Sequence, residues 1–306
     1  MAVLQAAQAR VLQGRGRMRG MLRWRRDRIG GGPPAAAVEV IGLTRFSWPG
    51  LGGFQTRHDS IAARRAALYA EDRLARRLRL FEALTLPSLR AQTDGDFTLG
   101  ILIGPDLPGW ARARLEGALA GLPQARLIVR PPGPHRAVLR EVMAGMRRAP
   151  GALSAQFRMD DDDAVGRPFV ARLRQVAAAQ AALAEDRGCF GVDFVTGWEV
   201  QPDPAGLRAA PLQISGLGVA QALVVRPGTA RAAFDFAHHK MSRFMAVVSL
   251  PDPDMFLRGL HGLNDSQPRR PALPLLDAAG EAHLRSAFGI DVAQIRTLWQ
   301  APLPAG

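Results

Sequence analysis

Four consecutive aspartates, Asp160 to Asp163, are the densest group of potential metal ligands in the sequence. They directly follow a short apolar segment, 155–159, that is predicted to be a strand. Carboxylates this close together raise one another's pKa unless a cation neutralises them. A site made of oxygen ligands suits Mg²⁺ or Mn²⁺, and both ions also bind phosphate oxygens. The run therefore indicates a divalent-metal site for a phosphate-bearing ligand.

The spacing of the aspartates predicts how they divide their roles. In an extended chain, side chains two residues apart point to the same side. Asp160 and Asp162 are therefore expected to point together, with Asp161 and Asp163 pointing away. One pair would meet the metal and the ligand, and the other would cap a helix expected to begin near Val165. The simpler alternative is an acidic loop that only caps this helix.

The elements around the aspartates alternate between short apolar runs and helical patterns, which is typical of βαβ units and a largely parallel sheet. Strands are expected at 38–46, 97–103, 126–129, 155–159, 189–200 and 220–226. Helices are expected at 71–90, 110–120, 135–148 and 166–185. Ligands of such sheets bind at the carboxyl ends of the strands, where the aspartates stand. The predicted fold class is α/β, with a mostly parallel, Rossmann-like sheet flanked by helices and an irregular part from Gln201 onward.

Length and composition allow one large core. The chain has 306 residues, of which 47% are hydrophobic and 22% charged, so it can bury enough apolar surface to fold. No apolar stretch approaches the roughly 18 residues of a membrane-spanning helix. The single cysteine, Cys189, excludes an internal disulfide and a CxxC zinc site.

The net charge of +13 is concentrated at the N-terminus. Residues 1–34 hold eight arginines and one acid, Asp27, and the breaker-rich GGGPPAAA segment follows them. We expect a basic flexible tail at 1–37 and a folded domain at 38–306. A solvated tail is the favoured interpretation, and an anchor on anionic lipid or a nucleic-acid-binding arm are the alternatives. No secretory signal pattern is present, so we expect a cytoplasmic protein, peripheral at the inner face of the membrane if the tail binds lipid.

Motifs of several enzyme classes are missing from the sequence. GxSxG, HExxH, a P-loop and a GxGxxG after the first strand do not occur, which argues against hydrolases, zincins, kinases and dinucleotide-binding enzymes. A metal-dependent nucleotidyltransferase also uses paired aspartates and remains an alternative. A non-enzymatic protein that binds nucleic acid or an anionic surface through the tail is a second alternative, but four aspartates without a metal would repel phosphate.

Several segments resemble the GT-A glycosyltransferases, and most closely the bacterial family described as putative rhamnosyltransferases. These segments are IGLTRFSW at 41–48, FEALTLPSLRAQTDGDF at 81–97, FRMDDDDA at 157–164 and LRGLHGLNDS at 257–266. The resemblance covers about residues 38–270. It implies a GT-A fold with a nucleotide-sugar-binding half at 38–165 and an acceptor-binding half at 166–306. It also implies an inverting hexosyltransferase, dependent on Mn²⁺ or Mg²⁺, that moves a sugar such as rhamnose from a nucleotide-sugar to a glycan or other hydroxyl acceptor.

The resemblance also assigns roles to residues. The Asp-x-Asp motif of GT-A enzymes places Asp160 and its neighbour Asp161 on the nucleotide-sugar, and Asp162 with Asp160 on the metal. The end of the first strand would contact the nucleotide base through Thr44, Arg45 and Phe46. The alternative is that Phe46 belongs to the core and Arg45 is a surface cation.

Late residues of the sequence are expected to complete the site. Some GT-A enzymes finish metal or phosphate binding with a late histidine, for which the candidates are His238, His239 and His261. Inverting members place a carboxylate base at the start of a helix beyond the metal motif. Asp254 is the expected base and Asp252 its alternative, since both precede a pattern around Leu257 that is expected to be helical. A plain helix N-cap is the other interpretation of either aspartate.

Overall fold

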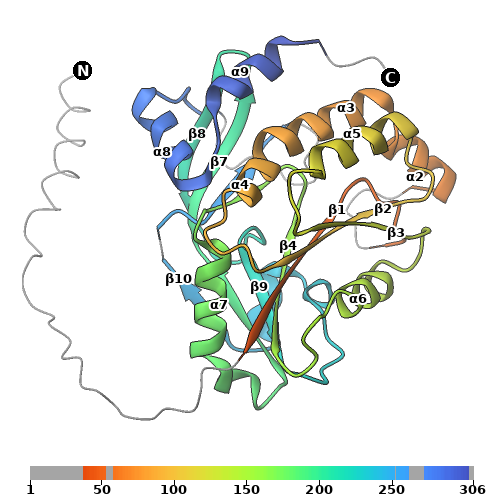
Figure 1. Cartoon of the computed structure of the whole chain (residues 1–306), viewed down its shortest axis with the longest axis vertical. Coiled ribbons are helices and arrows are strands. Elements are labelled where there is room, and N and C mark those ends of the chain that lie inside the picture. The colour runs from red at the N-terminus through yellow and green to blue at the C-terminus, as the bar shows by residue number, and fades with distance from the viewer. Residues whose placement is uncertain (1–36, 53–57, 252, 262–271, 303–306) are drawn as a thin grey trace, which may run out of the picture. The chain divides into compact units, whose positions relative to one another are not determined.

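A seven-stranded sheet forms the centre of the structure, a computed structural model that describes residues 37–52, 58–251, 253–261 and 272–302 (Figure 1). The strand order is β10 (Val247–Leu250), β6 (Cys189–Phe194), β9 (Gln221–Val225), β4 (Leu153–Met159), β1 (Val38–Arg45), β2 (Thr98–Ile103) and β3 (Ala125–Val129). Strands β4, β1, β2 and β3 run parallel, as do β10 and β6, while β9 is antiparallel to both its neighbours. The predicted α/β class with a mostly parallel sheet is confirmed.

Helices cover both faces of this sheet. One face carries α3 (Glu71–Leu80), α4 (Leu86–Arg90), α5 (Gly109–Leu119) and α7 (Phe169–Ala179). The other carries α6 (His135–Gly145) and the 3₁₀ helices η4 (Ala233–Asp235) and η5 (His238–Arg243). A π-helical turn, Phe81–Thr85, joins α3 to α4, so the helix expected at 71–90 is continuous. Helix α2 (Ile61–Leu68), capped by Ser60, was not expected from the sequence.

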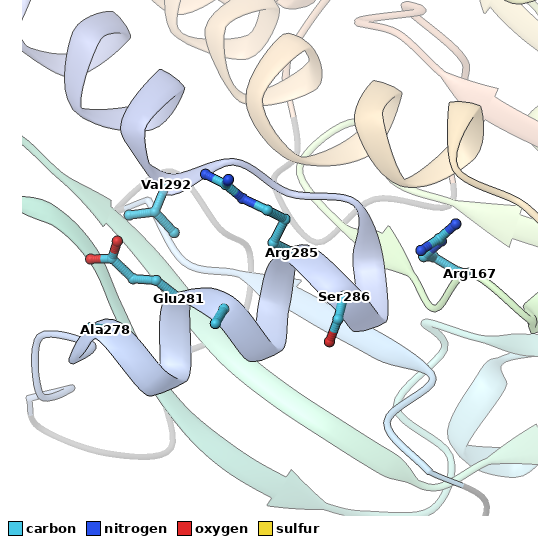
Figure 2. A pocket seen from close by; sticks show the side chains of 7 residues that line it. Arg167, Ala278, Glu281, Arg285, Ser286 and Val292 are labelled. Carbon is cyan, nitrogen blue, oxygen red and sulfur yellow. The ribbon is translucent and has the colours of Figure 1, made fainter.

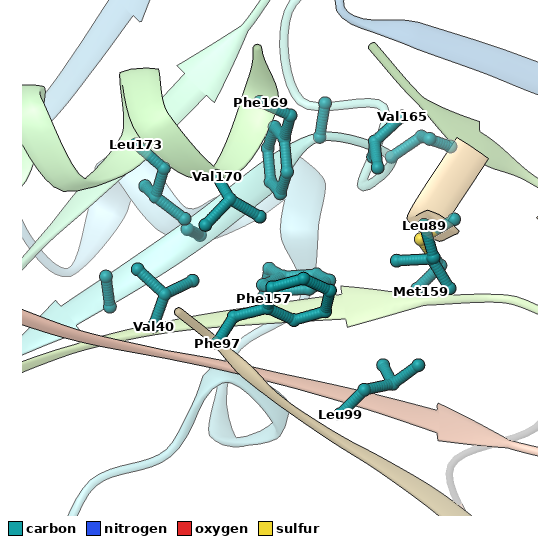
Figure 3. Close-up of a cluster of buried hydrophobic side chains, with 14 of the residues drawn as sticks. Val40, Leu89, Phe97, Leu99, Phe157, Met159, Val165, Phe169, Val170 and Leu173 are labelled. Atoms are coloured by element: carbon teal, nitrogen blue, oxygen red, sulfur yellow. The ribbon is translucent and has the colours of Figure 1, made fainter. Parts of the chain in front are cut away.

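Successive side chains of each strand point to opposite faces of the central sheet, so the apolar residues divide between two clusters, one on each face. On β1, Val40 faces the helices α3 to α5 and α7, whereas Leu43 faces α6. Phe157 of β4 lies on the first side, where its ring packs edge-on against Phe169 with 5.2 Å between centroids (Figure 3). Gly42 of β1 faces the same ring, and a Cβ there would lie 2.3 Å from a Phe157 ring carbon. Only glycine therefore lets the strand approach the aromatic core at this point.

A second sheet begins with β5, the strand that follows β4 in the chain. It has the order β5 (Ala164–Val165), β11 (Phe256–Gly259), β7 (Thr196–Asp203) and β8 (Gly206–Gln213). Helices α8 (Ala278–Phe288) and α9 (Val292–Gln300) close a third apolar cluster against it. The part of the chain from Gln201 onward, which was predicted to be irregular, is therefore built largely from paired strands and helices.

Three local predictions are wrong in this region. The strand expected at 189–200 is two strands, because β6 joins the central sheet and β7 joins the second one. The helix expected near Val165 starts only at Phe169, since 164–165 pair with β11. The segment around Leu257 is strand β11 and not a helix. In the last two cases pairing between distant segments overrides a local pattern that fits either structure.

The described residues form one compact unit that begins at β1. The central sheet takes strands from both sides of residue 165, the expected boundary between a donor half and an acceptor half. The predicted basic tail, 1–37, falls almost entirely outside the described residues. Within the described part of the chain, no helix is long and apolar enough to cross a bilayer.

Candidate functional site

The four aspartates, named the acidic cluster, stand where the two sheets meet. They follow β4 at the carboxyl edge of the central sheet and lead directly into β5 of the second sheet. Asp161 and Asp162 form a turn between the two strands. The backbone N–H of Gly259, at the end of β11, donates to Asp163 Oδ1 at 3.0 Å. The loop is therefore held by the two strands that flank it, β4 and β5, and by β11 from a distant part of the sequence.

Three of the four carboxylates converge. Asp160, Asp162 and Asp163 each offer an oxygen atom, and these atoms lie within 4.8 Å of one another. Asp160 is exposed, and the other three aspartates are buried. The expectation that Asp163 would point away and cap a helix is wrong, because the turn interrupts the alternation of an extended chain. Helix α7 starts after Pro168 without a side-chain cap.

Arg77 of α3 neutralises much of the buried negative charge. Its Nε donates to Asp161 Oδ2 at 2.9 Å, its Nη2 also contacts Asp161, and its Nη1 lies 3.3 Å from Asp162 Oδ2. Asp161 thus points at an arginine and stands outside the group of three. The sequence analysis missed Arg77, because nothing in the run EDRLARRLRL distinguishes it from its arginine neighbours.

His261, which follows β11, lies against Asp162. Its Nε2 is 2.5 Å from Asp162 Oδ2 and 2.9 Å from Arg77 Nη1. Burial alone would raise the pKa of Asp162, but Arg77 and His261 outweigh burial and lower that pKa to about 2. Burial, together with the charges of Asp162 and Asp160, raises the pKa of Asp163 well above its usual range. Asp162 is therefore held ionised, while Asp163 is destabilised as an anion.

The donor atoms of this cluster fit a divalent cation. Three carboxylate oxygens within 4.8 Å match the oxygen ligands that Mg²⁺ and Mn²⁺ prefer. A cation among them would also remove the repulsion that raises the pKa of Asp163. Asp160, Asp162 and Asp163 are the residues that could hold it, with the His261 imidazole beside Asp162.

A second group of charged residues adjoins Asp160 on the face of the sheet that carries α6. Arg45 Nη2 donates to Asp160 Oδ1 at 3.4 Å, and Arg45 Nη1 lies 2.8 Å from His135 Nε2 at the start of α6. The guanidinium carbons of Arg45 and Arg158 lie 5.7 and 5.9 Å from the ring centre of Phe234. The His135 ring is 6.1 Å from the same ring. Arg45, His135, Arg158 and Phe234 are named the arginine cluster.

Positive charge dominates the arginine cluster. Burial lowers the pKa of His135 to about 3, assisted by Arg45, Arg158, Arg136 and Arg64. Burial also lowers the pKa of Arg158 to about 10. The sequence analysis missed Arg158, although the strand LSAQFRM alternates apolar and polar residues and so places Arg158 on the polar side with Gln156.

Of the three residues predicted to contact the nucleotide base, only Arg45 is accessible. Thr44 and Phe46 are fully buried. Phe46 packs edge-on against Phe81, with 6.1 Å between ring centres. The hydroxyl of Thr44 has no hydrogen-bond partner within the described structure. Neighbouring positions of β1 point to opposite faces, so Arg45 reaches the edge of the site while the residues on either side of it enter the core.

Asp254, the predicted base, lies two residues before β11, whereas the acidic cluster contacts the end of that strand at Gly259. The two positions are five residues apart, which in extended chain corresponds to about 16 Å. Trp198 Nε1 donates to Asp254 Oδ2 at 2.8 Å, and His283 Nε2 of α8 lies 2.6 Å from the same oxygen. Asp252, the alternative base, lies outside the described residues. The base therefore remains a prediction.

His239 is exposed, and its ring contacts His238 with 5.1 Å between centroids. In the described part of the chain, no hydrogen bond or ion pair joins His239 to the acidic cluster. His261 is the late histidine that the structure places beside an aspartate.

A separate pocket of about 490 Å³ lies beside α8 and the start of α9 (Figure 2). Its lining includes Glu281, Arg285 and Ser286 from α8, with Arg167 from the segment before α7. No residue of the acidic or arginine cluster lines this pocket.

The fold and the site together define an α/β protein with an acidic cluster at the carboxyl edge of its sheet, the usual position for a ligand in this class. The family model described as "Putative rhamnosyl transferase" matches residues 39–273. This match covers most of the chain, so the protein belongs to that family, and the resemblance identified from the sequence motifs is confirmed.

Other comparisons give only distant similarity. No curated protein matches the sequence. Solved structures that match include S. aureus TarS 1–349 in complex with UDP-GlcNAc, at 10% identity and a TM-score of 0.37 over 74% of this chain and 59% of that chain. The same protein in complex with UDP matches at 10% identity and a TM-score of 0.37, over 73% of this chain and 60% of that chain. This chain thus aligns with less than two thirds of the length of these structures.

Proposed function

We propose that this protein is a metal-dependent glycosyltransferase that moves a sugar from a nucleotide-sugar to a glycan or other hydroxyl acceptor. The observation that carries the proposal is the convergence of Asp160, Asp162 and Asp163 at the carboxyl edge of the sheet, in a member of the rhamnosyl transferase family. The family description makes rhamnose the first donor sugar to test.

The chain's own residues supply the framework for this reaction. Asp160, Asp162 and Asp163 would hold the cation, which when bound stabilises the negative charge that develops on the departing nucleoside diphosphate. Arg77 keeps Asp161 and Asp162 in place through its hydrogen bonds, so two buried carboxylates are oriented before the ligand arrives. Arg45, which bonds to Asp160, stands at the accessible edge of the donor site.

The acceptor's proton needs a base, and Asp254 is the residue proposed for it, with inversion at the anomeric carbon as the stereochemical expectation. The hydrogen bond from Trp198 and the contact with His283 both involve Oδ2 of Asp254, and they hold this carboxylate in a fixed orientation.

A donor screen tests the proposed function. The melting temperature of the full chain would be measured with UDP-, GDP-, dTDP- and CMP-sugars, each with Mn²⁺, with Mg²⁺ and with EDTA. We expect one nucleotide class to raise the melting temperature, and to raise it much more with a divalent ion than in EDTA, because a ligand that binds the native state stabilises it.

Product analysis with the donor found in the screen identifies the reaction. A glycosyltransferase releases nucleoside diphosphate. Release of pyrophosphate from a nucleoside triphosphate would instead make the protein a nucleotidyltransferase. A chain that binds no nucleotide-sugar with either ion contradicts the proposal.

A further inference from the structure

Arg158 is a cation that makes no direct ion pair with a described residue. It lies on β4 two residues before Asp160 and is partly buried. In the described part of the chain it has no hydrogen bond and no ion pair within 4 Å; Asp160 favours its charge only at longer range, and its packing contact is the Phe234 ring. A guanidinium stays charged at physiological pH, so removing it from water without a partner is unfavourable. Such a residue indicates a position prepared for an anionic ligand.

The neighbours of Arg158 add to the positive charge. Arg45 lies against the same Phe234 ring, and its carboxylate contact, Asp160, is exposed and 3.4 Å away. The arginines Arg45, Arg158, Arg136 and Arg64 all disfavour protonation of His135. The local excess of positive charge is therefore spread over several guanidinium groups and does not depend on Arg158 alone.

Gly218 leaves room for the side chains of Arg158 and His238. A Cβ at Gly218 would lie 3.1 Å from Arg158 Nη2 and 3.1 Å from Cγ of His238. Arg158 and His238 therefore flank one position of the backbone. His238 Nδ1 donates to the carbonyl of Gly216 at 2.6 Å, which fixes the orientation of the ring and leaves Nε2 as its second polar atom.

We propose that Arg158, together with Arg45 and His238, binds the phosphate oxygens of the donor's diphosphate beside Asp160. This inference rests on the proposed function and names the part of the donor that the arginine cluster recognises. Guanidinium groups suit phosphate because two parallel N–H groups meet two oxygens. Because Arg45 also bonds to Asp160, the phosphate site adjoins the carboxylates that would hold the cation.

Inorganic pyrophosphate without divalent metal tests the site directly. Calorimetry on the full chain in EDTA should show pyrophosphate binding that weakens as salt is added. Arg158→Met keeps an unbranched side chain but removes the charge, and should weaken pyrophosphate binding roughly 10- to 100-fold, as expected for lost charged hydrogen bonds. Arg243→Met is the matched control, since Arg243 is exposed on η5, the helix that begins with His238, and it should bind like the wild type.

The melting temperature of the ligand-free variant separates binding from a structural role. Because Arg158 is unpaired, Arg158→Met should melt at the wild-type temperature or above it. A lower melting temperature with unchanged pyrophosphate affinity would mean that Arg158 only packs against Phe234, and would overturn the proposal. Arg45→Gln provides a second test, with the same expected loss of affinity, if Arg158→Met does not fold.

The outcomes distinguish this inference from the proposed function. If the wild type and Arg158→Met bind the donor nucleotide and pyrophosphate equally, the phosphate site is wrong and the glycosyltransferase proposal stands. If the wild type binds pyrophosphate through Arg158 but no nucleotide-sugar, the anion site stands and the proposed function fails. Absence of pyrophosphate binding to the wild type overturns the phosphate site.

Discussion

The acidic cluster and the arginine cluster adjoin at Asp160, but their charges are balanced in different ways. In the acidic cluster, Arg77 bonds to Asp161 and approaches Asp162, so much of the buried charge is neutralised within the protein. In the arginine cluster, Arg158 makes no hydrogen bond or close ion pair with a described residue, and Asp160 acts on it only at longer range. The two arginines thus differ in their partners: Arg77 is bonded to carboxylates, whereas Arg158 makes no hydrogen bond or close ion pair within the described part of the chain, and this difference is the basis for proposing that Arg158 binds a ligand.

Asp162→Asn should have the largest effect on function. The amide cannot bind a divalent ion as a carboxylate does, so we expect metal-dependent binding of the donor nucleotide to become undetectable by calorimetry while the protein stays folded. Asp72→Asn, an exposed aspartate near the start of α3, is the control. Unchanged nucleotide affinity in Asp162→Asn, or in wild-type protein with EDTA, would contradict the metal site.

Asp254→Asn tests a residue that belongs to neither cluster. If it takes the acceptor's proton, we expect kcat to fall by roughly 100- to 10,000-fold with unchanged donor affinity. His283→Gln changes a neighbour of the same Oδ2 and should stay within about tenfold of the wild-type kcat, since the carboxylate remains. Transfer by Asp254→Asn at a rate close to wild type, or a product that retains the donor's configuration, would remove the base assignment.

Arg77→Met tests the contrast between the two clusters through the free energy of unfolding. It leaves the buried carboxylates of Asp161 and Asp162 without their cation, so we expect a loss of about 3 to 5 kcal/mol in urea unfolding. Arg158→Met should show no such loss. Mn²⁺ should restore part of the stability of Arg77→Met, because it supplies positive charge at the same carboxylates. Equal stability of the two variants would mean that the clusters do not differ as described.

The lowered pKa of His135 predicts an effect of pH on stability that is smaller than the effect of Arg77→Met. Burial and the surrounding arginines lower its pKa to about 3 in the folded protein, against about 6.5 in the unfolded chain. Between these values the unfolded state binds one more proton, so stability is fully present above pH 6.5 and falls as the pH is lowered. From pH 7 to pH 5 this amounts to about 2 kcal/mol.

Urea unfolding at both pH values, compared between wild type and His135→Gln, isolates this contribution from that of other titrating groups. The variant should lose less stability than the wild type over the same pH interval. Equal losses would show that His135 is not held neutral by its surroundings.

The sequence by itself determined the order of the strands and helices as far as α7, apart from α2 and β5, and the place of the four aspartates after β4. Short apolar runs and helical periodicity are local properties, and they fixed these elements to within a few residues. The alternation in LSAQFRM also indicates the face of the sheet to which Arg158 points, since successive side chains of a strand point to opposite faces.

Only the tertiary structure decided which groups complete the site. Arg77 is 84 residues from Asp161 in sequence, and His261 is 99 residues from Asp162, so no local pattern relates either to its partner. Thr44 and Phe46 are buried because they point to the face of the sheet on which the larger core forms, so they do not reach the site. Pairing of β5 with β11, segments about 90 residues apart, delayed the start of α7 and made a strand of the segment around Leu257 that was expected to be helical. Long-range pairing and the balance of buried charge are properties of the folded chain, and a single segment of sequence does not contain them.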